Sequence, residues 1–222
     1  MKIGIVVATK TERKPFFEIF GQPDMCHLGL NSYDVSMWRL SSEKFVYLIL
    51  SGLGEINAAI STQYLIDTFD VDKIINYGVV GGLSEQQPAM KIGIVQKIVH
   101  YGFDISFGSN YTVGEYPEIG IFHIPNHYAI PESATTDLPK FTCASADIIV
   151  GGGEPKRKLH QEFGADICEM EAAGIVITCN RNNIPCSFIK AISDGVDEDV
   201  EAFDQYVHDA SRACAKLIAK LI

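Results

Sequence analysis

Residues 168–194 read CEMEAAGIVITCNRNNIPCSFIKAISD, and they combine two acidic residues, a helix-like segment and an apolar strand-like segment. Glu169 and Glu171 are two positions apart, so their side chains point the same way in an extended chain. The apolar segment 186–192 leads into Ser193 and Asp194. In open α/β sheets, ligands bind at the carboxyl ends of the strands. Acidic residues gathered at this edge indicate acid–base chemistry or recognition of a polyhydroxyl ligand.

Apolar and β-branched runs elsewhere in the chain predict further strands, and segments with helical periodicity lie between many of them. We expect strands at 2–8, 33–40, 45–51, 73–77, 92–100, 141–150 and 165–169, and helices after residue 9 and at 55–69, 154–163, 172–182 and 200–222. Strict alternation of strands and helices would need fewer strands. We therefore predict an α/β fold with a mixed central β-sheet flanked by helices on both faces. The 222 residues fit one domain spanning 1–222.

The composition limits the classes of partner. The formal net charge is −10 and the isoelectric point is about 5.0, which argues against nucleic acid or an anionic membrane as the main partner. The six cysteines lie mostly in apolar segments and form no C-x-x-C pair. We therefore predict reduced thiols in a cytoplasmic protein, with no metal and no cofactor. No apolar run is long enough to span a membrane.

Three short motifs at predicted strand ends each admit a structural and a functional interpretation. Thr9 and Glu12 match a capping box, which is the simpler interpretation of Glu12; the alternative is a carboxylate at the mouth of the first strand. The Gly-Leu-Gly turn at 52–54 resembles a phosphate cradle but equally suits close packing of a strand against a helix. The glycines between Gly78 and Gly82 either let a ligand approach the backbone or mark a turn or bulge.

Three further segments carry predictions about the core and the surface. In the expected helix 55–69, Ile56, Ile60 and Tyr64 recur every four residues and predict one buried stripe. The basic run 156–158 is interpreted as a solvated helix face. The segment 103–116 is rich in aromatic residues, glycine and serine. Such a loop suits either the border of a flat apolar ligand or a subunit interface.

Six segments, in their order and at their spacings, carry a family resemblance. They are KIGIVVA at 2–8 with Glu12 beyond it, SGLGEINAA at 51–59, IINYGVVGGL at 74–83, SAD at 145–147, EMEA at 169–172 and AISD at 191–194. Together they resemble the nucleoside phosphorylase/hydrolase superfamily, and most closely the 5'-methylthioadenosine/S-adenosylhomocysteine nucleosidases. The resemblance covers almost the whole chain. It implies a nucleoside phosphorylase-like fold and a small-molecule purine nucleoside as the substrate.

The resemblance also implies two catalytic residues. Breaking an N-glycosidic bond produces an oxocarbenium-like sugar and a purine anion, so the base needs a proton at N7 as it leaves. By resemblance Asp194 supplies this proton, with Ser193 holding its carboxyl group. Glu12 corresponds to the carboxylate that orients a water molecule toward C1'. A cap for the following turn is the structural alternative for Asp194.

The same resemblance implies a set of substrate-binding residues. Glu171 accepts hydrogen bonds from the ribose 2'- and 3'-hydroxyls, and Met170 packs against the sugar. Backbone groups near Ile149 and Val150 bind the adenine edge, while Leu53, Phe107 and Phe203 form the apolar pocket for a 5'-alkylthio group. Phe107 reaches into a neighbouring subunit's site, which implies a homodimer. The apolar members of this set are equally explained as core residues, Glu169 is assigned a structural role, and Asp147 either sets purine preference or is structural.

Two positions depart from the family pattern. The nucleosidases usually carry serine in the glycine-rich turn where this chain has Val79, next to Gly78, and arginine where it has Lys190. Both positions lie near the water and the sugar in the family, so Gly78, Val79 and Lys190 are included among the expected substrate-binding residues. Lysine keeps the charge of arginine but loses its planar two-pronged donor. The departures therefore point to a different substrate or to weak activity.

Three functions follow from these residues. Hydrolysis is favoured because the segment after the first strand carries Glu12, and an acid repels phosphate and suits activation of water. Phosphorolysis is the runner-up, since a phosphate site needs cationic donors and Lys10, Arg13 and Lys190 are candidates. The third function is a nucleoside-binding protein that has kept the pocket and lost turnover.

Overall fold

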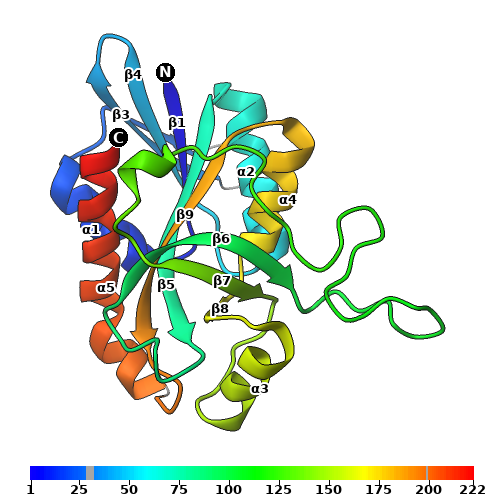
Figure 1. The fold of residues 1–222 in the computed structure, drawn as a ribbon. Coiled ribbons are helices and arrows are strands. Elements are labelled where there is room, and N and C mark those ends of the chain that lie inside the picture. Colours follow the sequence, from blue (N-terminus) through cyan, green and yellow to red (C-terminus); the bar gives the residue numbers. More distant parts are fainter. Residues whose placement is uncertain (29–32, 199) are drawn as a thin grey trace.

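The computed structural model describes residues 1–28, 33–198 and 200–222 and contains one nine-stranded sheet with five α-helices and a short 3₁₀-helix in that part of the chain (Figure 1). The strands are β1 (Lys2–Val7), β2 (Met25–Leu28), β3 (Asp34–Ser41), β4 (Lys44–Leu50), β5 (Lys73–Gly82), β6 (Ile92–His100), β7 (Lys140–Ser145), β8 (Ile167–Glu169) and β9 (Cys186–Asp194). The helices are α1 (Lys10–Phe20), α2 (Glu55–Phe69), η1 (Glu132–Ala134), α3 (Glu154–Phe163), α4 (Ala172–Asn182) and α5 (Val200–Leu221).

The sheet is mixed, as the sequence predicts. Its strand order is β2-β3-β4-β1-β5-β8-β7-β6-β9, and β5 also pairs with β9. The strands β4, β1, β5 and β9 run parallel to one another, whereas β2 and β3 are antiparallel additions at one edge. Because β5 pairs with both β8 and β9, the strands β5, β8, β7, β6 and β9 form a closed circuit. The carboxyl ends of β1, β5 and β9 consequently lie together.

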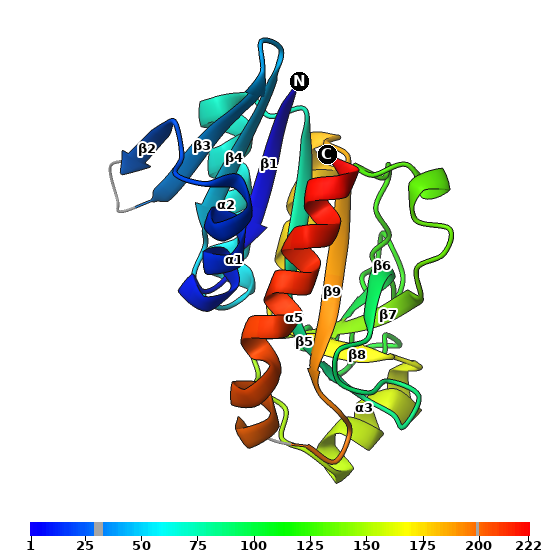
Figure 2. The same ribbon diagram turned by 90° about the vertical axis from the view of Figure 1, so that its left-hand side faces the viewer.

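Helices cover both faces of the sheet, which confirms the predicted architecture. In Figures 1 and 2, α1 and α5 lie together on one face, where Phe16 and Cys214 join the same core cluster as Ile5 and Tyr77. The helices α2 and α4 pack together against the opposite face (Figure 1) around a second cluster that includes Leu65. The shorter α3 lies beyond the ends of β5 and β9 (Figure 2).

Several element boundaries differ from the sequence predictions. β5 does not turn at Gly78 but continues to Gly82, because Gly81 and Gly82 pair with β8 and Gly81 also pairs with Asp194. β7 ends at Ser145 rather than at Val150, so residues 146–150 belong to neither a strand nor a helix. The short strand β2 is an addition that no pattern in the sequence predicted.

The predicted buried stripe of α2 is wrong for Ile56 and Ile60, whereas Tyr64 is partly buried against the second cluster. Ile56 and Ile60 are 73% and 47% exposed, whereas Ala58, Ser61, Thr62 and Leu65 are buried. The inward side of α2 packs very closely on α4: a Cβ atom added at Gly174 would lie 2.2 Å from the Glu55 carbonyl oxygen. Small residues are needed at such a contact, so the larger isoleucines lie on the opposite, outer side.

The described residues contain no helix that is long and apolar enough to cross a membrane. All six cysteines belong to this part of the chain and are free thiols. Five of them are buried and Cys26 is exposed, so the prediction of buried thiols fails for Cys26 alone.

Candidate active site

A cavity of about 460 Å³ opens at the carboxyl ends of β1, β5 and β9. Its walls come from Ala8, Thr9 and Glu12 after β1, residues 79–81 of β5, 148–151 after β7, 168–171 around β8, 193–194 of β9 and 203–204 of α5, together with Leu53. The lining is mostly apolar and includes the carboxyl groups of Glu12, Glu169, Glu171 and Asp194. The sheet topology thus brings together acidic residues that are more than 180 positions apart in the sequence.

Asp194 ends β9 and is held by two neighbours. The Ser193 hydroxyl donates to Asp194 Oδ1 at 2.6 Å, and the Lys156 ammonium group forms a very short ion pair with Asp194 Oδ2. The carboxyl group remains partly exposed to the cavity. Its orientation is therefore fixed while one side stays accessible to a ligand.

Glu12 takes part in both arrangements that the sequence suggested for it, a helix cap and a carboxylate at the mouth of the first strand. It closes a capping box at the start of α1, because the Thr9 hydroxyl accepts from the Glu12 amide while the Thr9 amide and hydroxyl lie 2.9 and 2.8 Å from Glu12 Oε2. The same side chain lines the cavity, and its Oε1 accepts from the Val79 amide at 3.0 Å. A Cβ atom at Gly78 would lie 2.5 Å from Glu12 Oε1, so glycine is needed there.

Glu171 lies between the cavity and the start of α2. Its Oε1 accepts from the Gly54 amide at 2.9 Å. Burial, followed by the neighbouring carboxylate of Glu169, raises the pKa of Glu171 to about 8 despite the opposing influence of Lys190. At pH 7 the Glu171 carboxyl group is thus mostly protonated. In this form it can both donate and accept a hydrogen bond.

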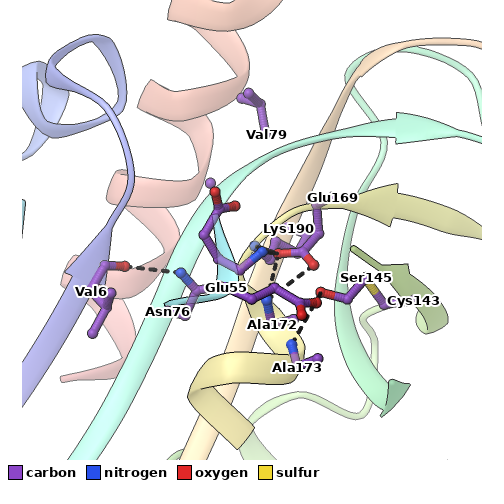
Figure 3. Close-up of polar contacts among 12 residues, drawn as sticks. Val6, Glu55, Asn76, Val79, Cys143, Ser145, Glu169, Ala172, Ala173 and Lys190 are labelled. Carbon is purple, nitrogen blue, oxygen red and sulfur yellow. Dashed lines mark hydrogen bonds and ion pairs between the residues drawn. The ribbon is translucent and has the colours of Figure 1, made fainter. Parts of the chain in front are cut away.

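Glu169, on the cavity wall, forms a buried ion pair with Lys190 (Figure 3). Lys190 Nζ is 3.0 Å from Glu169 Oε2, and the Glu169 carboxylate also accepts from the amides of Glu171 and Ala172. Although burial opposes both effects, the pairing keeps the pKa of Glu169 below its ordinary value and that of Lys190 above its own. Glu169 therefore fixes the backbone of the 169–172 segment, in agreement with its structural assignment.

Replacement of Glu171 by glutamine is expected to stabilise the protein increasingly as pH rises. The folded-state pKa of about 8 exceeds the ordinary value of 4.5, so between these pH values the folded chain retains a proton that the unfolded chain has lost. Stability from this group therefore falls as pH rises through that window, and glutamine does not ionise. We expect the variant to gain roughly 1–3 kcal/mol in unfolding free energy over the wild type between pH 5 and pH 8.

Urea unfolding at pH 5 and pH 8 measures this difference. Glu43 has an exposed side chain, so Glu43→Gln serves as a matched control and should show no pH-dependent gain. An equal effect of Glu171→Gln at both pH values would contradict the expectation.

The structure places most of the predicted site residues on the cavity wall. Met170, Ser193, Ile149, Val150, Leu53, Phe203 and Val79 line it together with Glu12, Glu171 and Asp194. Three expected residues are not part of the wall. Lys190 is buried behind it on Glu169, Gly78 lies beneath Glu12, and Phe107 is fully exposed on the long segment between β6 and β7. The Lys190 ammonium group thus contacts Glu169 instead of lining the cavity.

The structure shows the contacts of two further residues, Asp147 and Lys156. Asp147 Oδ1 accepts from the Glu55 amide at 2.7 Å, so this aspartate caps the start of α2. Lys156 is wholly buried, which corrects the interpretation of residues 156–158 as a solvated face. Only its neighbours are accessible: Arg157 is partly exposed and Lys158 is exposed. A lysine that begins a basic run gives no sequence signal that its side chain turns inward.

Metal binding has no support among the described residues, which contain no cluster of three or more histidine, cysteine or acidic side chains suited to an ion. His123 and His127 are four residues apart, a spacing that suits a metal on a helix, but they lie in an irregular segment. Burial, and then the neighbouring His100, lowers the pKa of His123 to about 4.

Comparison with known proteins agrees with this geometry. The family model of the phosphorylase superfamily matches residues 2–222. An aminodeoxyfutalosine nucleosidase of Helicobacter pylori is 27% identical over 100% of this chain and 97% of its own length. A 5'-methylthioadenosine/S-adenosylhomocysteine nucleosidase of Buchnera aphidicola is 32% identical over 90% of this chain and 87% of its own length.

A solved structure is similar to this chain over its whole length. The native structure of a futalosine hydrolase of Helicobacter pylori is 26% identical, with a TM-score of 0.90 over 100% of this chain and 97% of that chain. The family match and the 32% identity to the Buchnera protein extend over nearly all of the sequence. The chain therefore belongs to the phosphorylase superfamily, and the relatives described here are nucleosidases.

Proposed function

We propose that this protein is a nucleosidase that hydrolyses the N-glycosidic bond of a purine nucleoside. The observation that carries the proposal is the convergence of Glu12, Glu171 and Asp194 on one cavity. Among the described residues that line this cavity, none is lysine, arginine or histidine. A doubly charged phosphate would meet carboxyl groups without a compensating cation there, whereas water and a neutral nucleoside would not be repelled.

Asp194 is assigned the role of general acid. As the glycosidic bond breaks, the electron pair moves onto the purine, and a proton at N7 neutralises the leaving base. General acid catalysis of this kind contributes about 10²–10⁴-fold to a rate. Ser193 holds Oδ1 and Lys156 contacts Oδ2, and the carboxyl group they position lines the cavity, where the base would bind.

Glu12 is assigned the orientation of the attacking water. An ionised carboxylate offers about four lone-pair positions. Thr9 supplies two donors and Val79 a third, so about one position is left for a water molecule. The amide of Val79, in β5, is a backbone donor to Glu12, so this contact needs no side-chain hydroxyl at position 79.

Glu171 is assigned the ribose hydroxyls, with Met170 against the sugar ring. Its Oε1 is fixed by the Gly54 amide, which leaves the second oxygen for the substrate. The backbone beside Ile149 and Val150 forms the edge for the base, and Leu53 and Phe203 form an apolar wall. This wall favours a 5'-alkylthio group, and hence a nucleoside of the 5'-methylthioadenosine or S-adenosylhomocysteine type. The Helicobacter relative adds aminodeoxyfutalosine as the second candidate substrate.

Two of the three cations that could support phosphorolysis are held in ion pairs, and the third lies outside the cavity wall. Arg13 forms an ion pair with Asp34 at 2.6 Å, and Lys190 forms its pair with Glu169. Lys10 is exposed and is not part of the cavity wall. These contacts favour hydrolysis over phosphorolysis.

A substrate panel tests the proposal. The purified protein is incubated with methylthioadenosine, S-adenosylhomocysteine, aminodeoxyfutalosine, adenosine and inosine, and the products are separated by chromatography. We expect free adenine from at least one of the 5'-substituted nucleosides in the absence of phosphate. Nucleoside binding without release of base from any of them would instead support the binding protein and refute the hydrolase.

We further propose that the protein is a homodimer. Ile56, Ile60 and Leu53 expose apolar side chains along and just before α2. Beside this helix the segment between β6 and β7 extends away from the body of the protein (Figure 1) and carries the fully exposed Phe107. A second copy covering these residues would remove their apolar surface from water.

Replacement of Ile56 by aspartate is expected to convert this dimer into monomers, because it buries a charge in the interface. Light scattering coupled to size-exclusion chromatography measures the mass directly. Ile19→Asp is a matched control, since Ile19 is 37% exposed but lies on α1. A wild-type protein that is monomeric at micromolar concentration would refute the dimer.

A further inference from the structure

Lys156 is a buried cation that contacts the proposed acid from outside the cavity. It projects from α3, has no exposed surface and pairs with Asp194 Oδ2. Its ammonium group also donates to the carbonyl oxygens of Gly195 and Glu198, at 2.6 and 3.3 Å. Three oxygen acceptors thus surround the three donors of one ammonium group, which is what a buried lysine needs in order to stay charged.

The start of α3 fixes Lys156 in this position. The Gly153 amide donates to the Val196 carbonyl at 2.6 Å, and Arg157 binds both carboxylate oxygens of Asp197 at 2.7 and 2.6 Å. Lys156 is thus one of several links between α3 and the residues that follow β9. Unlike the others, it also contacts a side chain that faces the cavity.

The other groups around Asp194 are neutral or acidic. From β8 comes the Cys168 thiol, whose pKa is raised to about 12 by burial, so that it is uncharged at neutral pH. Glu169 and Glu171, Glu12 from α1 and Asp204 from α5 face the same cavity, while Asp197 and Glu198 lie in the following loop. Among these described neighbours, Lys156 is the cation in direct contact with Asp194.

We propose that Lys156 is a positioning residue for the reaction, which fixes the Asp194 carboxyl group at the cavity wall and sets the pH range in which that group carries a proton. The inference rests on the proposed nucleosidase function. An ammonium group in contact with a carboxyl group favours the ionised carboxylate, whereas general acid catalysis requires the protonated form. Contact with Lys156 therefore confines the protonated, catalytically competent form of the Asp194 carboxyl group to lower pH than the apolar cavity alone would.

The pH dependence of kcat/KM tests this role. In the wild type, the rate of base release should fall as rising pH removes the proton from Asp194. In Lys156→Gln, which can still donate hydrogen bonds but is neutral, we expect the midpoint of this fall to move up by about 1–3 pH units, the usual effect of a contacting charge. Lys156→Arg keeps the charge and should retain the wild-type midpoint. Lys158→Gln, from the exposed side of the same helix, is the matched control and should change nothing.

A Lys156→Gln profile that is lowered by one factor at every pH, with its midpoint unchanged, would mean that Lys156 is merely structural and would overturn the proposal. If the glutamine variant does not fold, Lys156→Met provides the same comparison.

A second measurement does not depend on turnover. The ¹³C resonance of the Asp194 carboxyl group, assigned by its loss in Asp194→Asn, reports protonation directly. We expect the Asp194 resonance of Lys156→Gln to titrate at higher pH than that of the wild type, because the contacting ammonium group is gone. Equal titration in the two proteins would overturn the inference even if the wild type is an active nucleosidase. A wild type without activity would refute the proposed function and leave this titration as the test of the ion pair.

Discussion

Replacement of Asp194 by asparagine is expected to lower kcat for base release by about 10²–10⁴-fold, because asparagine cannot give a proton to the departing purine. The side chain is isosteric, and its carbonyl oxygen can still accept from Ser193. Nucleoside binding should therefore weaken much less than kcat. Initial rates of adenine release, together with equilibrium binding of the nucleoside, separate the two effects.

The exposed Asp137 provides a control, since Asp137→Asn leaves the cavity untouched and should remain within about twofold of the wild type, as expected for a remote surface substitution. Because the change at residue 194 also leaves Lys156 without its carboxylate partner, circular dichroism must show that the variant is folded at the assay temperature. Unchanged activity in a folded Asp194→Asn protein would refute the assignment of the acid.

Replacement of Glu12 by glutamine is expected to lower kcat by about 10²–10³-fold with a smaller loss of stability. Glutamine is accepted in the third helical position of a capping box, so α1 should still form. However, the amide has one acceptor oxygen in place of two, and a neutral group orients and activates water less effectively than a carboxylate. Steady-state kinetics and thermal unfolding of the same preparation give both quantities.

Thr9→Ala is the matched control for the cap. It removes the hydroxyl that accepts from the Glu12 amide and donates to Glu12 Oε2, but it keeps the carboxylate itself, and it should cost about 1 kcal/mol of stability. If Glu12→Gln and Thr9→Ala lose stability and activity in the same proportion, Glu12 acts on the reaction only through the helix start. A large loss of kcat confined to Glu12→Gln would assign the carboxylate to the water.

Features of the fold that depend on neighbouring residues could be predicted from the sequence, whereas those that depend on contacts between distant segments could not. Short β-branched runs identified most strands, and the capping box at Thr9 and Glu12 gave the start of α1 correctly. Glycines at 78–82 looked like the end of a strand, yet pairing with β8 and β9 extends β5 through them. The spacing of Ile56 and Ile60 predicted a buried stripe, but an exposed apolar face has the same periodicity as a buried one.

The same distinction applies to the candidate site, where the acidic residues could be predicted and the positions of the two lysines could not. Glu12, Glu171 and Asp194 were found from motifs at strand ends, and the topology of a parallel sheet accounts for their meeting. Lys156 was missed because burial of a lysine depends on partners that lie far along the chain: Asp194 is 38 residues away. Lys190 was expected at the sugar, but it lies behind the wall in an ion pair with Glu169, and only the packing of β8 and β9 in the folded sheet brings the two together.

Identification of the sugar product from wild-type protein tests the central claim most directly. Methylthioadenosine is the first substrate, and the reaction is run in phosphate-free buffer and again with phosphate added. We expect adenine and the free reducing sugar at the same rate in both buffers. Release that requires phosphate and yields a sugar 1-phosphate would contradict hydrolysis and make the protein a phosphorylase.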